Sequence, residues 1–351
     1  MYEILRKKTA AGILGLLAVA MFFTPAAGAV SGVRAQSLKL IPIGHTVGIR
    51  MNAQGVLVVG LTTADGSENS PSPAREAGVK AGDVLCQIDD VALESAAQLQ
   101  QLVQQKGEQQ LTLKLRRGNK THFLSVQAIQ DAEGVYHLGA WVRDSIAGIG
   151  TVTFYDPETG ILGTLGHGIT DNDTAQLLPF GSGALMASSV KGVKKGVSGS
   201  PGELRGDFDQ SRDLGELFAN TSCGVFGTVD SCPWMEEREA IEVAEKEELR
   251  TGRATILSNI SGDQVREYQV EIEKLCLSGG NRNMILRVVD PQLLEATGGI
   301  VQGMSGSPIL QNGKLVGAVT HVLVNDPSRG YGIFIGNMLD MAYWEEAENV
   351  S

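Results

Sequence analysis

The 351-residue sequence has few aromatic residues, few cysteines and too little positive charge to balance its acidic side chains. Only 5% of the residues are Phe, Trp or Tyr, whereas 44 are glycine, a composition typical of many turns and short strands. The net charge of -11 argues against nucleic-acid binding, because a phosphate backbone needs basic side chains to neutralise it. The 42% share of hydrophobic residues is typical of globular proteins, and the length allows two domains.

Metal-ligand spacing of cysteine and histidine is also absent from the sequence, so we expect neither a metal nor another cofactor. The four cysteines are Cys86, Cys223, Cys232 and Cys276. Only Cys223 and Cys232 lie close in sequence. A disulfide between them in an oxidising compartment is therefore one alternative. Unpaired thiols are the favoured interpretation.

The N-terminus lacks an apolar run long enough to cross a bilayer comfortably. Arg6-Lys7-Lys8 precede an apolar run of 14 residues at 10–23, and small residues follow at 26–29. About 20 apolar residues span a bilayer, so the pattern favours an export signal that is either cleaved after Ala29 or retained as a membrane anchor. The positive flank keeps this end cytoplasmic, and the remainder faces outward. We assign residues 1–36 to this segment and a short linker.

Residues 43–128 are predicted to form a PDZ domain. Gly78-Val79-Lys80-Ala81-Gly82-Asp83 follows a short stretch of small residues and precedes an apolar strand, which resembles the bacterial PDZ signature. A helix at 95–104 and alternating strands up to 126 complete the pattern. PDZ domains bind an extended peptide by strand addition, with backbone amides on its terminal carboxylate. We place this carboxylate loop at Thr46, Val47, Gly48 and Ile49. The alternative is a PDZ domain that only packs on its neighbour.

The strongest catalytic motif is Gly303-Met304-Ser305-Gly306-Ser307-Pro308. Its glycines allow a sharp bend beside the serine, and the apolar stretches after it predict a strand-turn-strand unit. Trypsin-like proteases present their nucleophile in such a bend, with neighbouring amides directed at the oxyanion. The motif predicts Ser305 as the nucleophile and the amides of Gly303 and Ser305 as the oxyanion hole. The alternative is an ordinary loop between strands.

His167 lies between two glycines at the end of a predicted strand at 161–165, where trypsin-like proteases carry the general base. A second motif, Gly196-Val197-Ser198-Gly199-Ser200-Pro201, nearly repeats the first. Ser198 lies only 31 residues after His167, whereas Ser305 lies 138 residues after it. Most of two barrels must separate base and nucleophile, so we predict Ser198 to be a turn residue. His321 is expected to pack or to line the pocket.

The motifs Gly-x-Leu-Gly-His-Gly-Ile-Thr-Asp at 163–171 and Gly-Met-Ser-Gly-Ser-Pro-Ile at 303–309 resemble those of the SpoIVB peptidase family, the signalling serine peptidases of endospore-forming bacteria. HtrA-type proteases differ because their PDZ domain follows the catalytic domain. The resemblance implies a mainly β chain in which a PDZ domain (α+β) is followed by a trypsin-like double β-barrel at 129–351. It also implies synthesis in the forespore and export across the forespore membrane into the intermembrane space.

The same resemblance implies protein substrates. These are the chain itself and the regulatory subunit of an intramembrane metalloprotease, whose release triggers pro-sigma-K processing. The competing hypothesis is a non-catalytic adaptor of the cell envelope that only binds peptides. The presence of both His167 and Ser305 argues against that adaptor.

A histidine base needs a partner on its second ring nitrogen. Asp171 and Asp173 lie too close to His167 along a turn to reach it easily. Other aspartates in polar, loop-like sequence are Asp207, Asp209, Asp213 and Asp230. Asp290 ends an apolar run at 284–289, so a strand gives it a fixed place, and the family resemblance also favours it. We predict Asp290 as the third catalytic residue, with a pocket-lining or structural carboxylate as the alternative.

Overall fold

The computed structural model of the chain describes residues 38–63, 71–229, 233–235, 238–276 and 280–350. The predicted export segment at 1–36 and Cys232 lie outside these described residues. Within them, Cys86, Cys223 and Cys276 are free thiols. No helix in the described part of the chain is long and apolar enough to cross a membrane.

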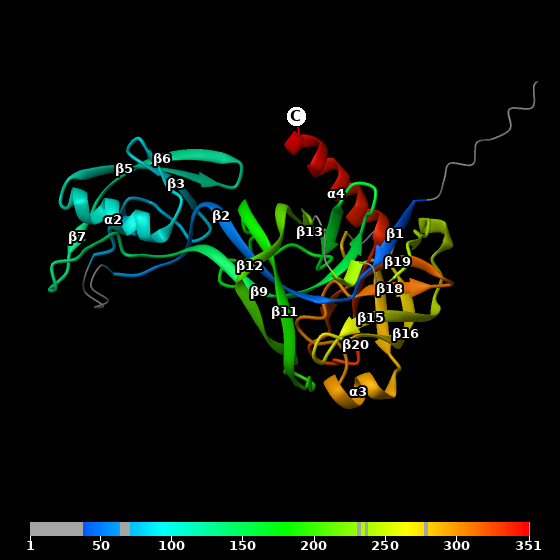
Figure 1. Cartoon of the computed structure of the whole chain (residues 1–351). Coiled ribbons are helices and arrows are strands. Elements are labelled where there is room, and N and C mark those ends of the chain that lie inside the picture. The colour runs from blue at the N-terminus through cyan, green and yellow to red at the C-terminus, as the bar shows by residue number, and fades with distance from the viewer. Residues whose placement is uncertain (1–37, 64–70, 230–232, 236–237, 277–279, 351) are drawn as a thin grey trace, which may run out of the picture. The chain divides into compact units, whose positions relative to one another are not determined.

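Strands make up most of the described chain (Figure 1). They are β1 (Lys39–Pro42), β2 (Thr46–Leu61), β3 (Val84–Ile88), β4 (Val91–Ala92), β5 (Gln110–Arg117), β6 (Lys120–Gln127), β7 (Ile129–Gln130), β8 (Tyr136–His137), β9 (Ala140–Tyr155), β10 (Ile161–Thr164), β11 (Phe180–Lys194), β12 (Glu203–Thr221), β13 (Gly224–Thr228), β14 (Ile241–Glu242), β15 (Gly252–Asn259), β16 (Val265–Leu275), β17 (Met284–Val288), β18 (Pro308–Gln311), β19 (Lys314–Val322) and β20 (Arg329–Phe334). The helices are α1 (Pro73–Glu76), α2 (Ala96–Lys106), α3 (Pro291–Thr297) and α4 (Ile335–Val350), with 3₁₀ turns at Pro233–Met235 and Lys246–Glu248.

The first barrel is a ring of six strands in the order β9, β10, β13, β12, β11 and β2, closed by the pairing of β2 with β9. Its strands are antiparallel to their neighbours, and alternate side chains point into the core. Val47 and Ile49 of β2 pack there with Val152, Leu162 and Val225. Side chains therefore fill the interior of this barrel.

The second barrel closes in the order β15, β16, β17, β20, β19 and β18. Its buried core contains Ile256, Leu286 and Val319, and α4 adds Met338 and Ala342 to the same cluster. The loop that carries Ser305 leads directly into β18. The mainly β fold with a double barrel that the sequence predicted is therefore confirmed.

The PDZ domain is inserted into the first barrel and does not precede it. Residues 46–52 of β2 pair with β9 inside the barrel, and residues 57–61 pair with residues 140–143 of the same strand. The part of the chain that lies between β2 and β9 in sequence forms a separate core, in which Leu99 of α2 packs with residues of β3 and β5. Both β2 and β9 thus run from one domain into the other (Figure 1). The predicted boundaries, 43–128, gave the barrel half of β2 to the wrong domain.

Candidate active site

The loop around Ser305 requires glycine at two positions. Gly303 and Gly306 have φ of 96° and 98°, a left-handed conformation that favours glycine. A Cβ on Gly306 would lie 1.9 Å from the Thr151 carbonyl oxygen. Thr151 also holds the loop directly, because its Oγ1 donates to the Gly303 carbonyl at 2.7 Å and its amide donates to the Ser305 carbonyl at 3.0 Å. The first barrel therefore fixes the loop of the second.

Two amides of this loop are left as free donors. The amide of Met304 donates to the Val301 carbonyl, and that of Gly306 donates to the Val319 carbonyl. Within the described chain, the amides of Gly303 and Ser305 donate no hydrogen bond. Both residues line the same cavity, so these two N–H groups can bind an oxyanion there.

A cavity of about 670 Å³ brings Ser305 and His167 together. His167 follows the end of β10, after a turn in which Leu165 and Gly166 both have φ of 66°. The hydroxyl of Ser305 donates to the Thr320 carbonyl at 2.5 Å, so it is not directed at His167. Attack on a substrate therefore requires the Ser305 side chain to rotate toward the histidine. Catalytic hydrogen bonds are often misaligned in substrate-free sites and form only when substrate binds.

His167 is held as a neutral base. Its Nδ1 lies 2.9 Å from the Gly168 carbonyl oxygen, to which it donates, so Nε2 is left as the proton acceptor. Burial lowers the pKa of His167, and the charge of Arg282 lowers it further, although the bond to Gly168 acts in the opposite direction. An imidazole with a lowered pKa is ready to accept a proton at neutral pH.

A second imidazole lines the cavity, as predicted for His321. Its ring centre lies 4.6 Å from that of His167, with the planes tilted by 34°. Burial lowers the pKa of His321 to about 4, and His167 and Arg282 contribute to the shift. Its buried Nδ1 has no hydrogen-bond partner among the described residues. Protonating either ring would place a positive charge beside the other, so both favour the neutral form.

Asp290 is not among the residues that line this cavity, and its carboxylate has a structural role. It caps α3 by accepting hydrogen bonds from the amides of Gln292 at 2.9 Å and Leu293 at 3.1 Å, and its second oxygen accepts from Gln269 at 3.2 Å. An aspartate followed by proline is an N-cap signal, because proline suits the first helical position. The structure therefore corrects the prediction that Asp290 completes a triad. Within the described cavity lining there is no acidic residue.

Asp290→Ala should lower the free energy of unfolding by about 1 kcal/mol, the typical value of an N-cap, and leave the turnover of the folded protein near wild type. Urea unfolding and ester hydrolysis measure the two effects. Asp290→Asn is the matched control, because asparagine caps a helix equally well. A loss of turnover on the order of 10⁴ in a folded Asp290→Asn protein, the effect of a wrong tautomer in a triad, would restore the catalytic assignment.

The predicted carboxylate loop of the PDZ domain is also corrected. Thr46, Val47, Gly48 and Ile49 are buried in the first barrel, where β2 pairs with β9 on one edge and β11 on the other. A strand with both edges paired offers no backbone groups to a peptide. The prediction failed because residues 47–51 and 56–61 both have strand patterns, and such a pattern does not show which of the two segments belongs to the PDZ domain.

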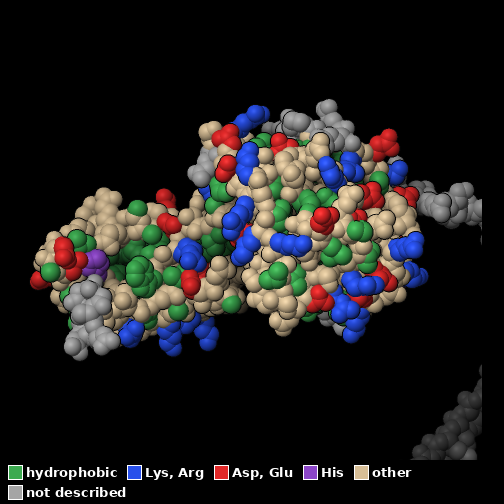
Figure 2. All heavy atoms as spheres, turned by 90° about the horizontal axis from the view of Figure 1, so that it is seen from below, with side chains coloured by type: hydrophobic (Ala, Val, Ile, Leu, Met, Phe, Trp, Pro, Cys, Tyr) green, Lys and Arg blue, Asp and Glu red, His purple; other side chains and the backbone are tan. Residues whose placement is uncertain are grey.

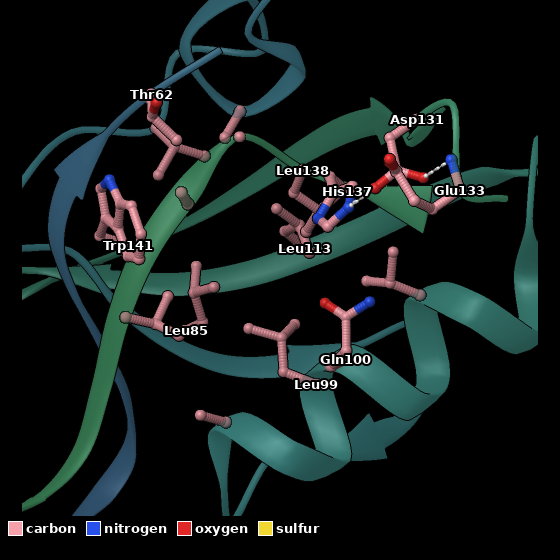
Figure 3. Close-up of a pocket in the computed structure, with 17 residues that line it drawn as sticks. Thr62, Leu85, Leu99, Gln100, Leu113, Asp131, Glu133, His137, Leu138 and Trp141 are labelled. Atoms are coloured by element: carbon pink, nitrogen blue, oxygen red, sulfur yellow. Dashed lines mark hydrogen bonds and ion pairs between the residues drawn. The ribbon is translucent and has the colours of Figure 1, made fainter. Parts of the chain in front are cut away.

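The PDZ domain has its groove elsewhere, between α2 and the start of β9. A cavity of about 430 Å³ lies there, with Leu99 and Gln100 on one side and Trp141 on the other (Figure 3). Residues 140–142 pair only with β2 among the described strands, so their other edge is open. His137 Nε2 lies 2.6 Å from Asp131 Oδ2 at one end. On the face seen in Figure 2, hydrophobic side chains gather around a hollow with acidic side chains at its rim.

The turn at Leu138 and Gly139 suits a carboxylate loop. Gly139 has φ of 73°, and the Leu138 carbonyl accepts a hydrogen bond from Ala74 at 2.8 Å. The Gly139 amide, on the opposite side of that peptide, donates to no other described residue. This turn was not predicted, because it lies beyond the predicted end of the PDZ domain at residue 128. The available signal was a Leu-Gly pair before an alternating strand.

Two closed barrels, a nucleophile loop with free amides and a histidine in the same cavity define a serine peptidase that carries a PDZ domain. A family model described as SpoIVB peptidase S55 matches residues 134–339, and a PDZ domain model matches residues 68–117. The chain belongs to the SpoIVB peptidase family. The resemblance inferred from its motifs is thereby confirmed. No curated protein matches the chain.

The solved structures that match the chain include a PDZ domain and a protease. The PDZ domain of the SdrC-like protein from Listeria monocytogenes shares 21% identity over 25% of this chain and 87% of its own, with a TM-score of 0.22. The active form of the Rv3671c protease from M. tuberculosis shares 15% identity over 56% of this chain and 73% of its own, with a TM-score of 0.34. Its inactive form shares 16% identity, with a TM-score of 0.32, over 56% and 82% of the two chains.

Proposed function

We propose that this serine peptidase is an exported signalling protease of sporulation. It cleaves itself and then the regulatory subunit of an intramembrane metalloprotease, which triggers pro-sigma-K processing. Membership of the SpoIVB peptidase family supports this physiology, and the meeting of Ser305 and His167 in one cavity carries the chemistry. The N-terminal segment at 1–36 supports export into the intermembrane space, with a membrane anchor or a cleaved signal.

The chemistry follows from the atoms that line the cavity. Nε2 of His167 accepts the proton of Ser305 as the serine oxygen attacks the substrate carbonyl. The amides of Gly303 and Ser305 bind the oxyanion, each contributing about 3 kcal/mol in comparable sites. His167 then gives its proton to the leaving amine. A water molecule hydrolyses the acyl-enzyme by the same route.

Mass spectrometry of the purified full chain with the purified metalloprotease subunit tests the proposed substrates. We expect cleavage within both proteins. A chain that hydrolyses a peptide ester and leaves the subunit intact would place its substrate elsewhere. A chain that no serine-directed inhibitor labels would favour the non-catalytic adaptor.

The PDZ groove is proposed to bind an extended peptide and so to couple recognition to proteolysis. Ala96→Trp would fill the groove from α2, because Ala96 lines it. We expect cleavage of protein substrates to fall by about tenfold or more, since roughly 1.4 kcal/mol of lost binding corresponds to a factor of ten. Hydrolysis of a small peptide ester should not change.

Ala97→Trp is the matched control, because the next residue of α2 is exposed and is not part of the groove lining. Both activities are measured for each variant. If Ala96→Trp lowered ester hydrolysis as much as protein cleavage, the domain would have a folding role and not a recognition role.

A further inference from the structure

The turn between β11 and β12, residues 195–202, reaches across to the second barrel. This β11–β12 turn contains the motif that resembles the nucleophile loop. The Gly196 amide donates to the Thr297 carbonyl at 2.8 Å, and the Gly199 amide donates to the Val324 carbonyl at 2.9 Å. Two side chains add to these contacts. Ser198 Oγ donates to the Asn325 carbonyl at 2.8 Å, and Lys195 Nζ donates to the Glu295 carbonyl at 3.0 Å.

The end of the turn and the start of β12 pair with Gln302, the residue that precedes the nucleophile loop. Glu203 and Gln302 form a parallel bridge. The Leu204 amide donates to the Gln302 carbonyl at 2.8 Å, and the Gln302 amide donates to the Gly202 carbonyl at 2.9 Å. The last residue of the turn and the start of β12 therefore hold Gln302 by both of its backbone polar groups.

This pairing decides where the Gly303 amide points. A trans peptide is planar, so the carbonyl of Gln302 and the N–H of Gly303 point in opposite directions. Because the Gln302 carbonyl is bound by Leu204, the Gly303 N–H points away from β12, and Gly303 lines the catalytic cavity. A flip of this peptide would break the bond to Leu204 and remove one donor from the oxyanion hole.

We propose that the β11–β12 turn positions the oxyanion hole, by holding Gln302 so that the Gly303 amide faces the substrate. Gly202 and Leu204 are positioning residues in this arrangement, because they act through Gln302. The proposal rests on the peptidase activity proposed above. The β11–β12 turn then has a role in catalysis, although the short spacing between His167 and Ser198 excludes Ser198 as the nucleophile.

Gly202→Ala tests the proposal by displacing the turn. A Cβ there would lie 2.3 Å from the Lys194 carbonyl oxygen and 2.5 Å from the Gly196 nitrogen, so the backbone must shift. Gly192→Ala in β11 is the matched control, because a Cβ at that position meets nothing within 4 Å. Neither glycine has a positive φ, so alanine strains the backbone conformation at neither position.

We expect Gly202→Ala to lower kcat for a small peptide ester by about tenfold to a hundredfold with KM unchanged, since an oxyanion donor stabilises the transition state and not the bound substrate. Affinity for a peptide boronate, whose adduct with Ser305 is tetrahedral, should fall by the same factor. Gly192→Ala should match the wild type in both measurements.

Wild-type kcat and boronate affinity in a folded Gly202→Ala protein would overturn the proposal. Equal losses in kcat and substrate affinity would also overturn it, in favour of general damage. If Gly202→Ala does not fold, Lys195→Ala decides, because Lys195 is exposed and anchors the same turn. Its kcat should fall about twofold to fivefold with KM unchanged, and an unchanged kcat would overturn the proposal. Inactivity of the wild type itself would count against the proposed peptidase function instead.

Discussion

In a time course followed by mass spectrometry, Ser305→Ala protein should stay intact while the wild type shortens itself. Turnover should fall by a factor on the order of 10⁶, because the covalent route is lost with its nucleophile. The fold should persist, since the Ser305 side chain makes one hydrogen bond, to the Thr320 carbonyl, and such a bond contributes about 1 kcal/mol. Thr151 binds backbone atoms of the loop, and alanine keeps these.

Ser198→Ala is the control for this experiment, because the same motif surrounds both serines. Its hydroxyl donates to the Asn325 carbonyl and is not part of the described cavity lining. We expect its turnover to fall by no more than about tenfold, in line with the loss of one hydrogen bond. Wild-type rates of self-cleavage in Ser305→Ala would move the nucleophile away from Ser305.

His167→Ala should reduce turnover by a comparable factor, because base and nucleophile act as a unit. The pH dependence gives a second test. The pKa of His167 is lowered by burial from its usual value of 6.5, so its neutral form predominates at pH 7. We expect kcat/KM for a small ester to keep its plateau through pH 6.5 and to fall only at lower pH, as the ring takes up a proton.

His122→Ala is the control for this profile, since His122 lies in β6 of the PDZ domain. It should show the wild-type acid limb, whereas the residual rate of His167→Ala should lack it. An acid limb centred above pH 6.5 would contradict the environment described for His167. The free energy of unfolding should also fall below pH 6.5, because the unfolded chain then binds protons that the two half-buried imidazoles exclude when folded.

The two barrels and the meeting of Ser305 with His167 could be predicted, because glycine-flanked motifs and their separation along the chain are features of the sequence itself. The partner of His167 could not. The partner is the backbone carbonyl of Gly168. Every residue has a backbone carbonyl, so the sequence does not show which one accepts a hydrogen bond. Asp290 was misassigned because the strand pattern before it was given more weight than the Asp-Pro cap signal after it.

The position of the PDZ groove could not be predicted for a different reason. Its open strand begins at Ala140, far from the signature that identifies the domain, and the same strand continues into the first barrel. Hydrophobic alternation shows that such a segment is a strand. It does not show which of two sheets each half will join, since both sheets require the same pattern. The register of β9 against β2 therefore had to come from the structure.

The insertion of the PDZ domain into the first barrel has a consequence for folding. Asn52 and Ser145 face each other across β2 and β9, although about 90 residues separate them in sequence. Bringing the ends of so long a flexible loop together costs about 4 kcal/mol of chain entropy, from (3/2)RT ln n. A folded PDZ domain holds β2 and β9 side by side where they enter and leave it. The barrel halves of these two strands are then already close together. We therefore expect the PDZ domain to fold before the first barrel, because its folding brings together the two strands on which that barrel closes.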